Sequence, residues 1–492
     1  MYLLREERAR ASLPFSNTFG VSRKNVVALA PTGVAALNVQ GQTIHSFFRF
    51  KPDITAAKVA SLRVGEEASA LYKGLEAIII DEVSMVRADL LDCVDAFLKI
   101  HGPMKGRPFG GLQMILIGDL YQLPPVVSGS EKQVFRSMYD TPYFFSAHAF
   151  KELEMELVEL EDIYRQQDKK FIAVLNAIRN NSVAEQDMSL LNQRFSPDFE
   201  PKKGEFFICL TTTNALADQI NLRELDKLKR RSHTFTAEIK GDFGQEYMPT
   251  RVELKVKPGA QIMMLNNDSD GRWVNGTIGT VLGIKSSGTE GACIEARLVD
   301  GMTVQITPHK WEIFRFFMQE GHLQSEVVGT FTQFPLMLAW AVTIHKSQGK
   351  TFDRVIIDIG RGTFTHGQMY VALSRCTTLE GIILRQRINK NNIWADYRVV
   401  KFLTGFQYEQ AEQTTSFEQK VEMIEKAIKH RHALKIVYLK PNDEKSSRII
   451  EPQSIGEVEY NGVSFIGMRA FCLKRHETRT FRVDRILEIA EV

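Results

Sequence analysis

Three short apolar runs near the start of the chain constrain its fold more than any other feature. They are rich in β-branched residues and span Asn25–Ala30, Ala77–Glu82 and Gln113–Asp119. Runs that are apolar on both faces are typical of strands buried in a parallel sheet. The segment Asp89–Ile100 carries apolar residues at helical spacing and follows the second run, as a crossover helix does. The sequence therefore predicts an open α/β sheet in a first domain, at residues 1–150.

Further patterns divide the rest of the chain. A second α/β pattern covers residues 151–225 and resumes at residues 332–405. Between these segments, Gly-rich and Asn-Gly turns join strand-like runs, which predicts a small β-barrel-like insertion at residues 226–331. A polar stretch at residues 406–416 is interpreted as a linker, and residues 417–492 as a compact α+β domain. A chain of 492 residues with 44% hydrophobic side chains is large enough for these several cores.

Charge and cysteine content limit the possible partners and the compartment. A net charge of +3 means that any nucleic acid would be bound by local basic surface rather than by a global field. The 5 cysteines form no Cys-x-x-Cys pair, which argues against a zinc site or a disulfide framework. No apolar run is long enough to span a membrane and the first residues do not form a signal peptide, so we expect a cytoplasmic protein with no membrane association.

Polar side chains follow two of the predicted buried strands. Asp81 and Glu82 end one strand, and Asp119 and Gln122 follow the next. Ligands of open α/β sheets bind at this edge. An aspartate there can hold Mg²⁺, and the adjacent glutamate can deprotonate a water that attacks a γ-phosphate. An apolar run that ends in Asp-Glu is by itself more often a solvated strand end, but two successive strands with polar ends favour a nucleotide site.

Seven sequence blocks occur in an order that resembles the petite-integration-frequency (PIF) and RecD-like helicases of superfamily 1. They lie between about Asn25 and Arg385 and read LAPTGVAALNVQGQTIHSFF, IIIDEVSM, GDLYQLPPV, YRQQD, LTTTNALADQIN, TIHKSQGKTFD and MYVALSRC. The resemblance implies two RecA-like domains, with an SH3-like insertion in the second. It also implies coupling of ATP hydrolysis, with Mg²⁺, to movement along single-stranded DNA, typically 5′ to 3′.

The resemblance also implies roles for individual residues. The catalytic set would be Asp81, which binds Mg²⁺, with Glu82, Gln122, Arg165 and Arg375; the two arginines would reach the γ-phosphate across the cleft between the domains. Nucleotide contacts would come from Asp119, Gln166, Gln348 and Gly349. Single-stranded DNA would be held by Pro31, Thr32, Gly33, His45, Ser46, His345, Lys346 and Ser347. Such phosphate contacts position a strand without reading its sequence.

Two other segments have weaker or partial matches. Residues 47–73 would include the family's wedge, in which Phe47 and Phe48 either stack on bases or pack in the core, with packing slightly favoured. The tail from Phe417 to Val492 is similar to a WYL domain, although Phe465, Ile466 and Gly467 occupy the slot of the naming triplet. Its basic surface would comprise Arg469, Arg479, Arg482 and Arg485, suited to a nucleotide or nucleic acid, and a solvated strand face with ion pairs is an equally good interpretation.

The chain departs from the family at its beginning. The first 24 residues contain one glycine, Gly20, and no Gly-Lys-Ser or Gly-Lys-Thr, so the loop that cradles the phosphates in P-loop enzymes is missing. With one choice of synonymous codons, the coding sequence of Arg5 to Val21 read from its third base translates as GRAGTGKSTLLQYFRS. That peptide is a phosphate loop and the start of its helix. We therefore hypothesise a frame slip between about Val21 and Lys24.

Two functions of different classes follow. The first is an ATP-dependent DNA helicase, expected to be a monomer, that acts on single strands and duplex junctions in DNA repair, recombination or replication. The second is a non-catalytic nucleic-acid-binding scaffold in which a degenerate motor and the WYL-like tail only bind. The series of motifs indicates that the chain descends from helicases. The missing loop favours the scaffold function for the chain as written.

Overall fold

The fold is known from a computed structural model. It describes residues 2–5, 25–127, 131–159, 165–166, 168–179, 182–202, 204–287, 291–360, 362–363, 365–393, 396–440, 445–460 and 462–492. The chain divides into two compact units, one formed by Met1–Leu175 with Glu185–Ile393, and the other by Asn176–Ala184 with Trp394–Val492. Among the described residues, no helix has the length and apolar character needed to cross a membrane.

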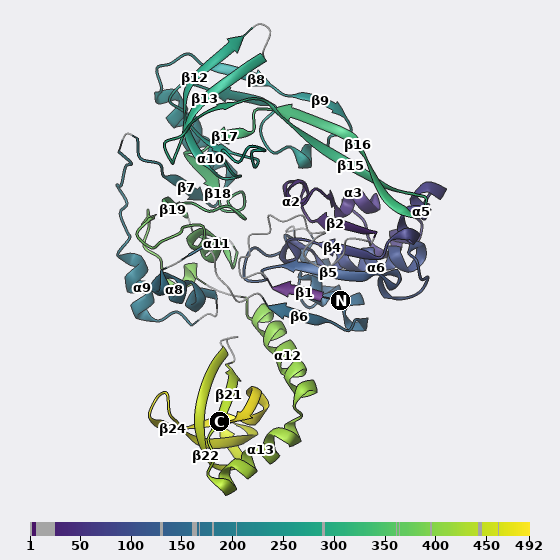
Figure 1. The fold of residues 1–492 in the computed structure, drawn as a ribbon, viewed down its shortest axis with the longest axis vertical. Coiled ribbons are helices and arrows are strands. Elements are labelled where there is room, and N and C mark those ends of the chain that lie inside the picture. Colours follow the sequence, from purple (N-terminus) through teal and green to yellow (C-terminus); the bar gives the residue numbers. More distant parts are fainter. Residues whose placement is uncertain are drawn as a thin grey trace. The chain divides into compact units, whose positions relative to one another are not determined.

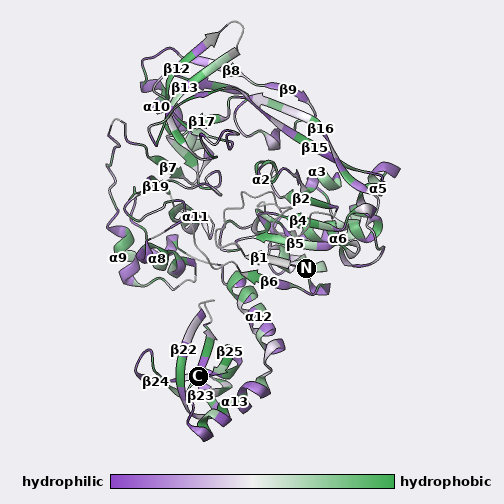
Figure 2. Cartoon of the chain, in the orientation of Figure 1, coloured by the Kyte–Doolittle hydropathy of each residue, from purple (hydrophilic) through white to green (hydrophobic). Residues whose placement is uncertain are grey.

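The first unit begins with a six-stranded parallel sheet in the order β3-β2-β4-β5-β1-β6 (Figure 1). β4 and β5 are largely hydrophobic, as their colour in Figure 2 shows, and every residue of β4 is buried. Burial on both faces explains the continuous apolar runs of the sequence. The strands are β1 (Tyr2–Arg5), β2 (Val26–Ala30), β3 (Gln42–Thr43), β4 (Ala77–Ile80), β5 (Gln113–Gly118) and β6 (Glu156–Glu159).

Helices of this part follow the expected crossover pattern. They are α2 (Gly33–Asn38), α3 (Ile44–Phe48), α4 (Ala56–Val59), α5 (Glu66–Gly74), α6 (Ala88–His101) and α7 (Lys132–Met138). The expected helix at Asp89–Ile100 is thus present within α6. The sheet extends beyond the expected domain boundary at residue 150, because β6 pairs with β1 in parallel register.

Phe47 and Phe48 pack in the core. Both side chains are buried, and their rings contact Tyr72 at centroid distances of 5.6 and 6.0 Å. Phe97 of α6 joins the same cluster, with its centroid 5.2 Å from that of Phe48. Because these edge-to-face and stacked contacts bury both rings, neither ring is available to stack on a base in this arrangement.

A β insertion interrupts the second half of the first unit. Its strands form a two-stranded pair, a five-stranded antiparallel sheet and a three-stranded sheet that contains the long hairpin β15–β16 (Figure 1). The bounds are β8 (His233–Thr236), β9 (Glu238–Gly241), β10 (Glu253–Val256), β11 (Gln261–Met264), β12 (Ile278–Ser287), β13 (Gly291–Leu298), β14 (Thr303–Ile306), β15 (His309–Gln319), β16 (His322–Gln333) and β17 (Leu336–Leu338). The insertion has its own core, which includes Ile262, Trp273 and Ile294.

The tip of the β15–β16 hairpin is joined to the first sheet by one side chain. The Asn25 amide donates to the carbonyl oxygens of Gly74 and Gly321, each at 3.0 Å, and its oxygen accepts from the Leu323 N–H at 2.9 Å. The hairpin therefore lies against α5, which agrees with the close approach of Gly74 to the Met318 side chain.

A second parallel sheet, in the order β18-β7-β19-β20, completes the first unit. Its strands are β7 (Ile208–Thr211), β18 (Ala341–Thr343), β19 (Val355–Asp358) and β20 (Ile382–Leu384). The helices of this part are α8 (Lys169–Arg179), which belongs to the first unit only up to Leu175, α9 (Glu185–Asn192), α10 (Asn214–Lys227) and α11 (Gln368–Ser374). The pairs β7–β18 and β7–β19 join segments far apart in sequence, so the β insertion lies between strands of one sheet.

The second unit contains α12 (Tyr397–Thr414), α13 (Phe417–His430) and a five-stranded sheet in the order β24-β23-β22-β21-β25. The strands are β21 (Leu434–Leu439), β22 (Lys445–Tyr460), β23 (Val463–Cys472), β24 (Glu477–Arg482) and β25 (Ile486–Glu491). Ile424 of α13 packs on Leu434, Ile450 and Met468. The interpretation of residues 406–416 as a linker needs correction, because most of this polar stretch belongs to α12; its Ala411 is buried, which continues the apolar face of that helix.

Candidate nucleotide-binding edge and DNA-binding loop

Asp81 and Glu82 lie directly after β4, at the carboxyl edge of the first sheet. The Asp81 N–H donates to the Leu29 carbonyl at 2.9 Å, which extends the pairing with β2 by one residue. Burial raises the pKa of the Asp81 carboxyl above its usual range. Glu82 has a φ of 50° in the left-handed region, a conformation that non-glycine residues adopt at a cost. The turn therefore places two neighbouring carboxylates at the end of β4.

Asp119 and Gln122 follow β5, the strand next to β4. Asp119 is buried, and its carboxylate accepts from the Tyr121 N–H at 3.0 Å and the Gln122 amide at 3.2 Å. Gly118 allows this strand end to approach the Asp81–Glu82 turn, because a Cβ at this position would lie 3.0 Å from the Val83 nitrogen. The predicted convergence of polar side chains at this edge is thus present.

The strand β1 lies between β5 and β6 in the first sheet. Leu4 is paired with Ile117 of β5 and with Val158 of β6, and β1 ends at Arg5. Arg5 therefore lies at the same edge of the sheet as Asp81 and Asp119. The sequence departure at residues 6–24, where the phosphate loop was expected, lies outside the described residues.

Gln348 joins this edge to the second parallel sheet. It follows β18, and its side-chain amide donates to Glu82 Oε2 at 2.8 Å and to Gln122 Oε1 at 3.0 Å. The adjacent Gly349 has a φ of 75°, which suits a residue without Cβ at this turn. Of the residues expected to contact nucleotide, Gln348 and Asp119 therefore lie with the expected base, Glu82.

Arg165, Gln166 and Arg375 lie together on the second sheet. Gln166 is buried, and its amide donates to the carbonyls of Ser374 and Cys376 at 3.0 and 2.9 Å. Arg165 reaches the same Ser374 carbonyl at 3.5 Å. Arg375 is 1% exposed, and its guanidinium donates to the carbonyls of Val371 at 3.0 Å and Lys350 at 3.3 Å. In this arrangement Arg375 points into its own domain, so a role at the phosphate requires it to leave these carbonyls.

The residues expected to line the DNA track in the first domain lie around α2 and α3. Pro31 is half-buried, and Thr32 caps α2 by accepting from the Ala35 N–H at 3.3 Å. Gly33 packs under the insertion, since a Cβ there would lie 2.1 Å from the Glu246 carbonyl oxygen. Ser46 is exposed, and burial lowers the pKa of His45, so its ring is mainly neutral near pH 7 and offers a hydrogen bond rather than a charge.

The corresponding loop of the second domain presents its charge to solvent. His345 and Lys346 are exposed, whereas Ser347 is fully buried and donates to the Ile344 carbonyl at 2.7 Å. The Ser347 carbonyl accepts from Arg375 at 3.5 Å. The loop therefore combines two surface residues with a buried anchor, and the expected direct DNA contact of the Ser347 side chain is unavailable in this arrangement.

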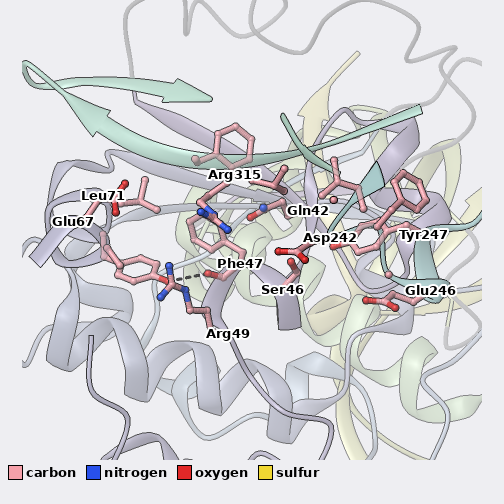
Figure 3. Close-up of a pocket in the computed structure, with 18 residues that line it drawn as sticks. Gln42, Ser46, Phe47, Arg49, Glu67, Leu71, Asp242, Glu246, Tyr247 and Arg315 are labelled. Carbon is pink, nitrogen blue, oxygen red and sulfur yellow. Dashed lines mark hydrogen bonds between the residues drawn. The ribbon is translucent and has the colours of Figure 1, made fainter. Parts of the chain in front are cut away.

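A cavity of about 790 Å³ lies between α3, α5 and the insertion (Figure 3). It is lined by both arginines and carboxylates, among them Arg49, Arg315, Glu67 and Asp242. Ser46 also faces it, which places one of the expected DNA contacts at its wall. Sequence reasoning did not identify this cavity, because its lining residues up to Tyr72 and those from Gly241 onward are 169 positions apart in the sequence (241 − 72).

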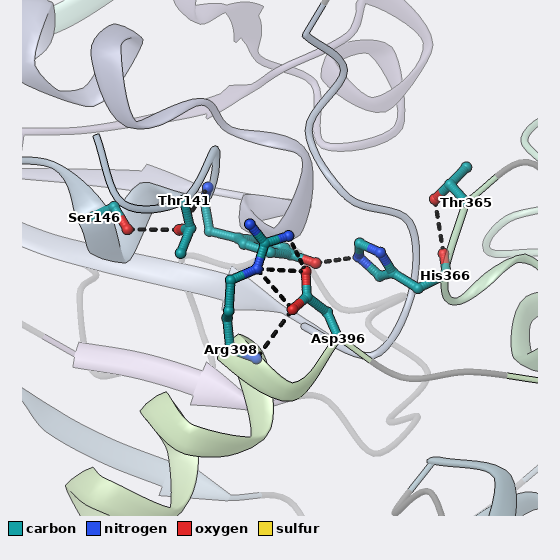
Figure 4. Close-up of polar contacts among 7 residues, drawn as sticks. Thr141, Ser146, Thr365, His366, Asp396 and Arg398 are labelled. Atoms are coloured by element: carbon teal, nitrogen blue, oxygen red, sulfur yellow. Dashed lines mark hydrogen bonds and ion pairs between the residues drawn. The ribbon is translucent and has the colours of Figure 1, made fainter. Parts of the chain in front are cut away.

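Two further contacts between the parallel sheets were also not foreseen. Tyr143 and His366, both buried, share a hydrogen bond between the Tyr143 hydroxyl and the His366 ring (Figure 4). Gly367 has a φ of 78°, and a Cβ there would lie 2.2 Å from the Gln122 carbonyl oxygen. This glycine, two residues before the MYVALSRC block, was the available sequence signal, since close backbone approach is a common reason for glycine.

Lys350 is a half-buried lysine at the end of the same loop as Gln348. It donates to the Asn275 side chain, and burial lowers its pKa to about 8. Between this value and the usual one near 10.5, the native state binds fewer protons than the unfolded chain. The charged lysine therefore costs stability below pH 8, and this cost is relieved as the pH rises toward 10.5.

Lys350→Met is accordingly expected to stabilise the first unit at pH 7 by on the order of 1 kcal/mol, after loss of the Asn275 hydrogen bond. The advantage should shrink as the pH is raised from 7 to 10. Urea unfolding at both pH values measures it, with Lys202→Met, at an exposed position, as the matched control. If the stability gained by Lys350→Met is the same at both pH values, the pKa of Lys350 is not lowered by burial.

The expected basic surface of the C-terminal domain is partly paired. Arg479 forms an ion pair with Glu477 at 2.6 Å, and Arg482 with Asp484 at 2.6 Å. The Arg482 guanidinium also lies 4.7 Å from the Phe465 ring centroid. Arg469 is exposed and Arg485 half-buried. In the same unit, Asp396 caps α12 and pairs with Arg398 at 2.5 Å, as Figure 4 also shows.

Comparisons with known proteins agree with this arrangement. The sequence profile of PIF1-like helicases matches residues 15–189, and that of the WYL domain matches residues 419–491. The human ATP-dependent DNA helicase PIF1 is 33% identical over 391 residues, which cover 77% of this chain and 56% of the human protein. This chain thus spans little more than half the length of that relative.

Solved structures give the wider match. Bacteroides Pif1 in complex with ADP-AlF4 is 35% identical, with a TM-score of 0.75 and coverage of 83% of this chain and 93% of that one. Bacteroides Pif1 bound to single-stranded DNA is 34% identical, with the same coverage and a TM-score of 0.57. The two parallel sheets are RecA-like domains, the tail is a WYL domain, and the chain belongs to the PIF1-like helicase family.

Proposed function

We propose that this chain is the core of an ATP-dependent DNA helicase that moves along single-stranded DNA in the 5′ to 3′ direction. The observation that carries the proposal is the hydrogen bond of Gln348, on the second RecA-like domain, to Glu82 and Gln122 on the first. Through such a contact, changes at the nucleotide-binding edge can alter the relative positions of the two RecA-like domains, both of which are expected to bind DNA. Such a motor would act on single strands and duplex junctions in DNA repair, recombination or replication.

The residues at the edge of the first sheet fit nucleotide and Mg²⁺. Mg²⁺ prefers oxygen ligands and is usually held by one or two carboxylates together with phosphates and water. Asp81 and Asp119 supply such oxygens, and among the described residues no cluster of three or more His, Cys, Asp or Glu side chains offers a closed metal site. Bound Mg²⁺ and phosphates would supply the electrophile, and Glu82 would orient and deprotonate the attacking water.

We further propose that the chain as written lacks ATPase activity because its phosphate loop is out of frame. The position of β1 between β5 and β6 supports this idea, since β1 ends at the edge of the sheet where Asp81 and Asp119 lie. The sequence after Arg5 contains no lysine before Lys24. Sequencing the coding DNA of codons 1–24 tests the frame slip, and the idea fails if the shifted frame does not encode a Gly-Lys-Ser loop.

DNA binding is expected to depend on the exposed loop of the second domain. Lys346→Ala should weaken single-stranded DNA binding several-fold and lower the salt dependence by about one phosphate contact. Fluorescence anisotropy at several salt concentrations measures both, and Lys202→Ala serves as the control because that lysine is also exposed. Equal effects of the two substitutions would rule out a specific contact at Lys346.

The scaffold function remains a second candidate because the loop sequence is missing. In that case the degenerate motor and the WYL domain would bind nucleic acid or a nucleotide without turnover. In the WYL domain, Arg469 is the arginine best placed to bind such a ligand. It is exposed and forms no ion pair within the described residues, unlike Arg479 and Arg482. DNA binding by the 492-residue chain without ATP hydrolysis would favour this function only if the coding DNA shows no frame slip.

A further inference from the structure

Three consecutive basic residues, Lys229, Arg230 and Arg231, lie between the end of α10 and the start of β8. All three side chains are exposed, and within the described residues none of them forms an ion pair or a side-chain hydrogen bond. Lys227, in the last turn of α10, differs from them because it pairs with Glu224 at 2.9 Å. The three residues, called the basic segment below, therefore present positive charge to solvent.

The chain is anchored on both sides of the basic segment. Before it, the Lys257 ammonium donates to the carbonyls of Leu225 and Leu228 at 3.0 and 3.1 Å, and Leu228 packs on the core of the β insertion. After it, His233 pairs with Val256 at one end of the β8–β10 pair. Because both ends are fixed, a ligand that binds here has little backbone motion to restrict.

The basic segment and the loop expected to contact DNA lie at opposite ends of the second parallel sheet. Asn221 of α10 exchanges hydrogen bonds with Ala341, the first residue of β18, at 2.7 and 2.9 Å. α10 starts after the carboxyl end of β7 and passes Ala341 before it ends, so the basic segment follows at the amino end of the sheet. His345 and Lys346 follow the carboxyl end of β18. The basic segment is therefore separate from the expected track for single-stranded DNA.

The chemistry of the basic segment fits the phosphates of duplex DNA. Duplex DNA carries one negative charge per about 1.7 Å of helix axis, and lysine and arginine bind these phosphates without reading sequence. Proteins that hold single strands add aromatic side chains on which bases stack. The nearest phenylalanine, tyrosine or tryptophan in the sequence is Phe235, whose ring lies 4.6 Å from that of Phe334 and packs on the core of the insertion. The basic segment thus offers charge without a stacking surface.

We propose that the basic segment binds the phosphate backbone of duplex DNA, outside the track that holds the single strand. The inference rests on the proposed helicase function, because a motor that moves along a single strand meets duplex DNA at a junction. With two separate contacts, the chain holds the duplex and the single strand of one junction together. Binding at either contact then raises the effective concentration of DNA at the other.

Fluorescence anisotropy with a blunt duplex and with a single strand of the same length tests the inference in the 492-residue chain without nucleotide. Lys229→Glu, Arg230→Glu and Arg231→Glu together should weaken duplex binding by about tenfold or more. They should also lower the slope of log affinity against log salt by about 2 to 3, since three phosphate contacts are lost. Single-strand binding should change little, whereas Lys346→Ala should weaken single-strand binding and leave duplex binding unchanged. Replacement of the same three residues by Gln removes the charge without adding repulsion and should show part of the loss.

A second triple variant controls for the change in net charge. Lys169→Glu, Lys170→Glu and Lys202→Glu together make the same change at exposed lysines elsewhere in the first unit. This variant should bind the duplex as the unchanged chain does. Equal losses of duplex binding in the two triple variants would overturn the inference, because a general field would then explain the binding. A loss of single-strand binding as large as the loss of duplex binding would also overturn it.

Two outcomes separate this inference from the proposed function. Duplex binding that depends on the basic segment, in a chain that binds no single-stranded DNA, would support the inference and refute the helicase function. Single-strand binding that depends on Lys346, with duplex binding that the Glu variant of the basic segment leaves unchanged, would refute only the inference. Poly-glutamate that binds the basic segment as tightly as a duplex of equal charge would overturn the inference in favour of an acidic protein partner.

Discussion

Repair of the phosphate loop is expected to convert a chain without measurable ATPase into a DNA-stimulated ATPase. The change replaces residues 5–21 by GRAGTGKSTLLQYFRS, which supplies backbone N–H groups for the phosphates and a lysine to neutralise them. Asp81, Glu82 and Asp119, which we propose form the rest of the site, lie at the edge where β1 ends. The measurement is phosphate release with and without single-stranded DNA, for the repaired chain and for the chain as written.

Glu82→Gln in the repaired chain identifies the chemistry behind that activity. The amide keeps the shape of the side chain but cannot accept the proton, so turnover should fall by about 10² to 10⁴, the range of general-base catalysis. Single-stranded DNA binding should persist. Robust turnover by the unrepaired 492-residue chain would refute the loop hypothesis, whereas unchanged turnover of Glu82→Gln would refute only the role of this base.

Arg375→Ala in the repaired chain is expected to lower kcat by about 10³ or more, the effect attributed to arginines that stabilise the transferred phosphoryl group. Arg375 is fully buried, and its guanidinium satisfies the carbonyls of Val371, Ser347 and Lys350. Its removal leaves the Lys350 carbonyl without this donor, whereas the Val371 carbonyl keeps the Ser374 hydroxyl and the Ser347 carbonyl keeps the Lys350 N–H. The alanine variant should therefore also be less stable. Its melting temperature has to be measured together with its rate.

Arg375→Lys separates catalysis from stability. Lysine keeps the charge but loses the planar fork that meets two phosphate oxygens, so kcat should fall while DNA affinity without nucleotide changes little. Arg354→Lys is the matched control, because this exposed arginine of the same domain pairs with Glu205 at 3.6 Å. Near-full activity of Arg375→Lys would mean that charge alone suffices, and near-full activity of Arg375→Ala would exclude a role at the phosphate.

Much of the fold was predictable because its information is local. The apolar runs at Val26–Ala30, Ala77–Ile80 and Gln113–Gly118 are strands because a parallel sheet covered on both faces requires continuous apolar residues. The convergence of Asp81 and Asp119 followed from the rule that neighbouring parallel strands end at the same edge. The domain boundaries were harder to predict from the sequence. β6 lies past the expected boundary because it pairs with β1, and α12 continues into the polar stretch because one face of the helix is buried.

The sequence by itself determined the class of the protein, namely the order of its motifs, the two α/β halves with their β insertion, and the departure in the first 24 residues. Only the tertiary structure decided which partners the site residues have. It placed Gln348 between Glu82 and Gln122, turned Arg375 into its own domain, and buried Ser347 and Phe47. The reason is physical: hydrogen-bond partners and burial depend on how different segments of the chain pack together, and the partners of Gln348 are 226 and 266 positions away in the sequence. Strand and helix patterns depend on neighbours in the chain.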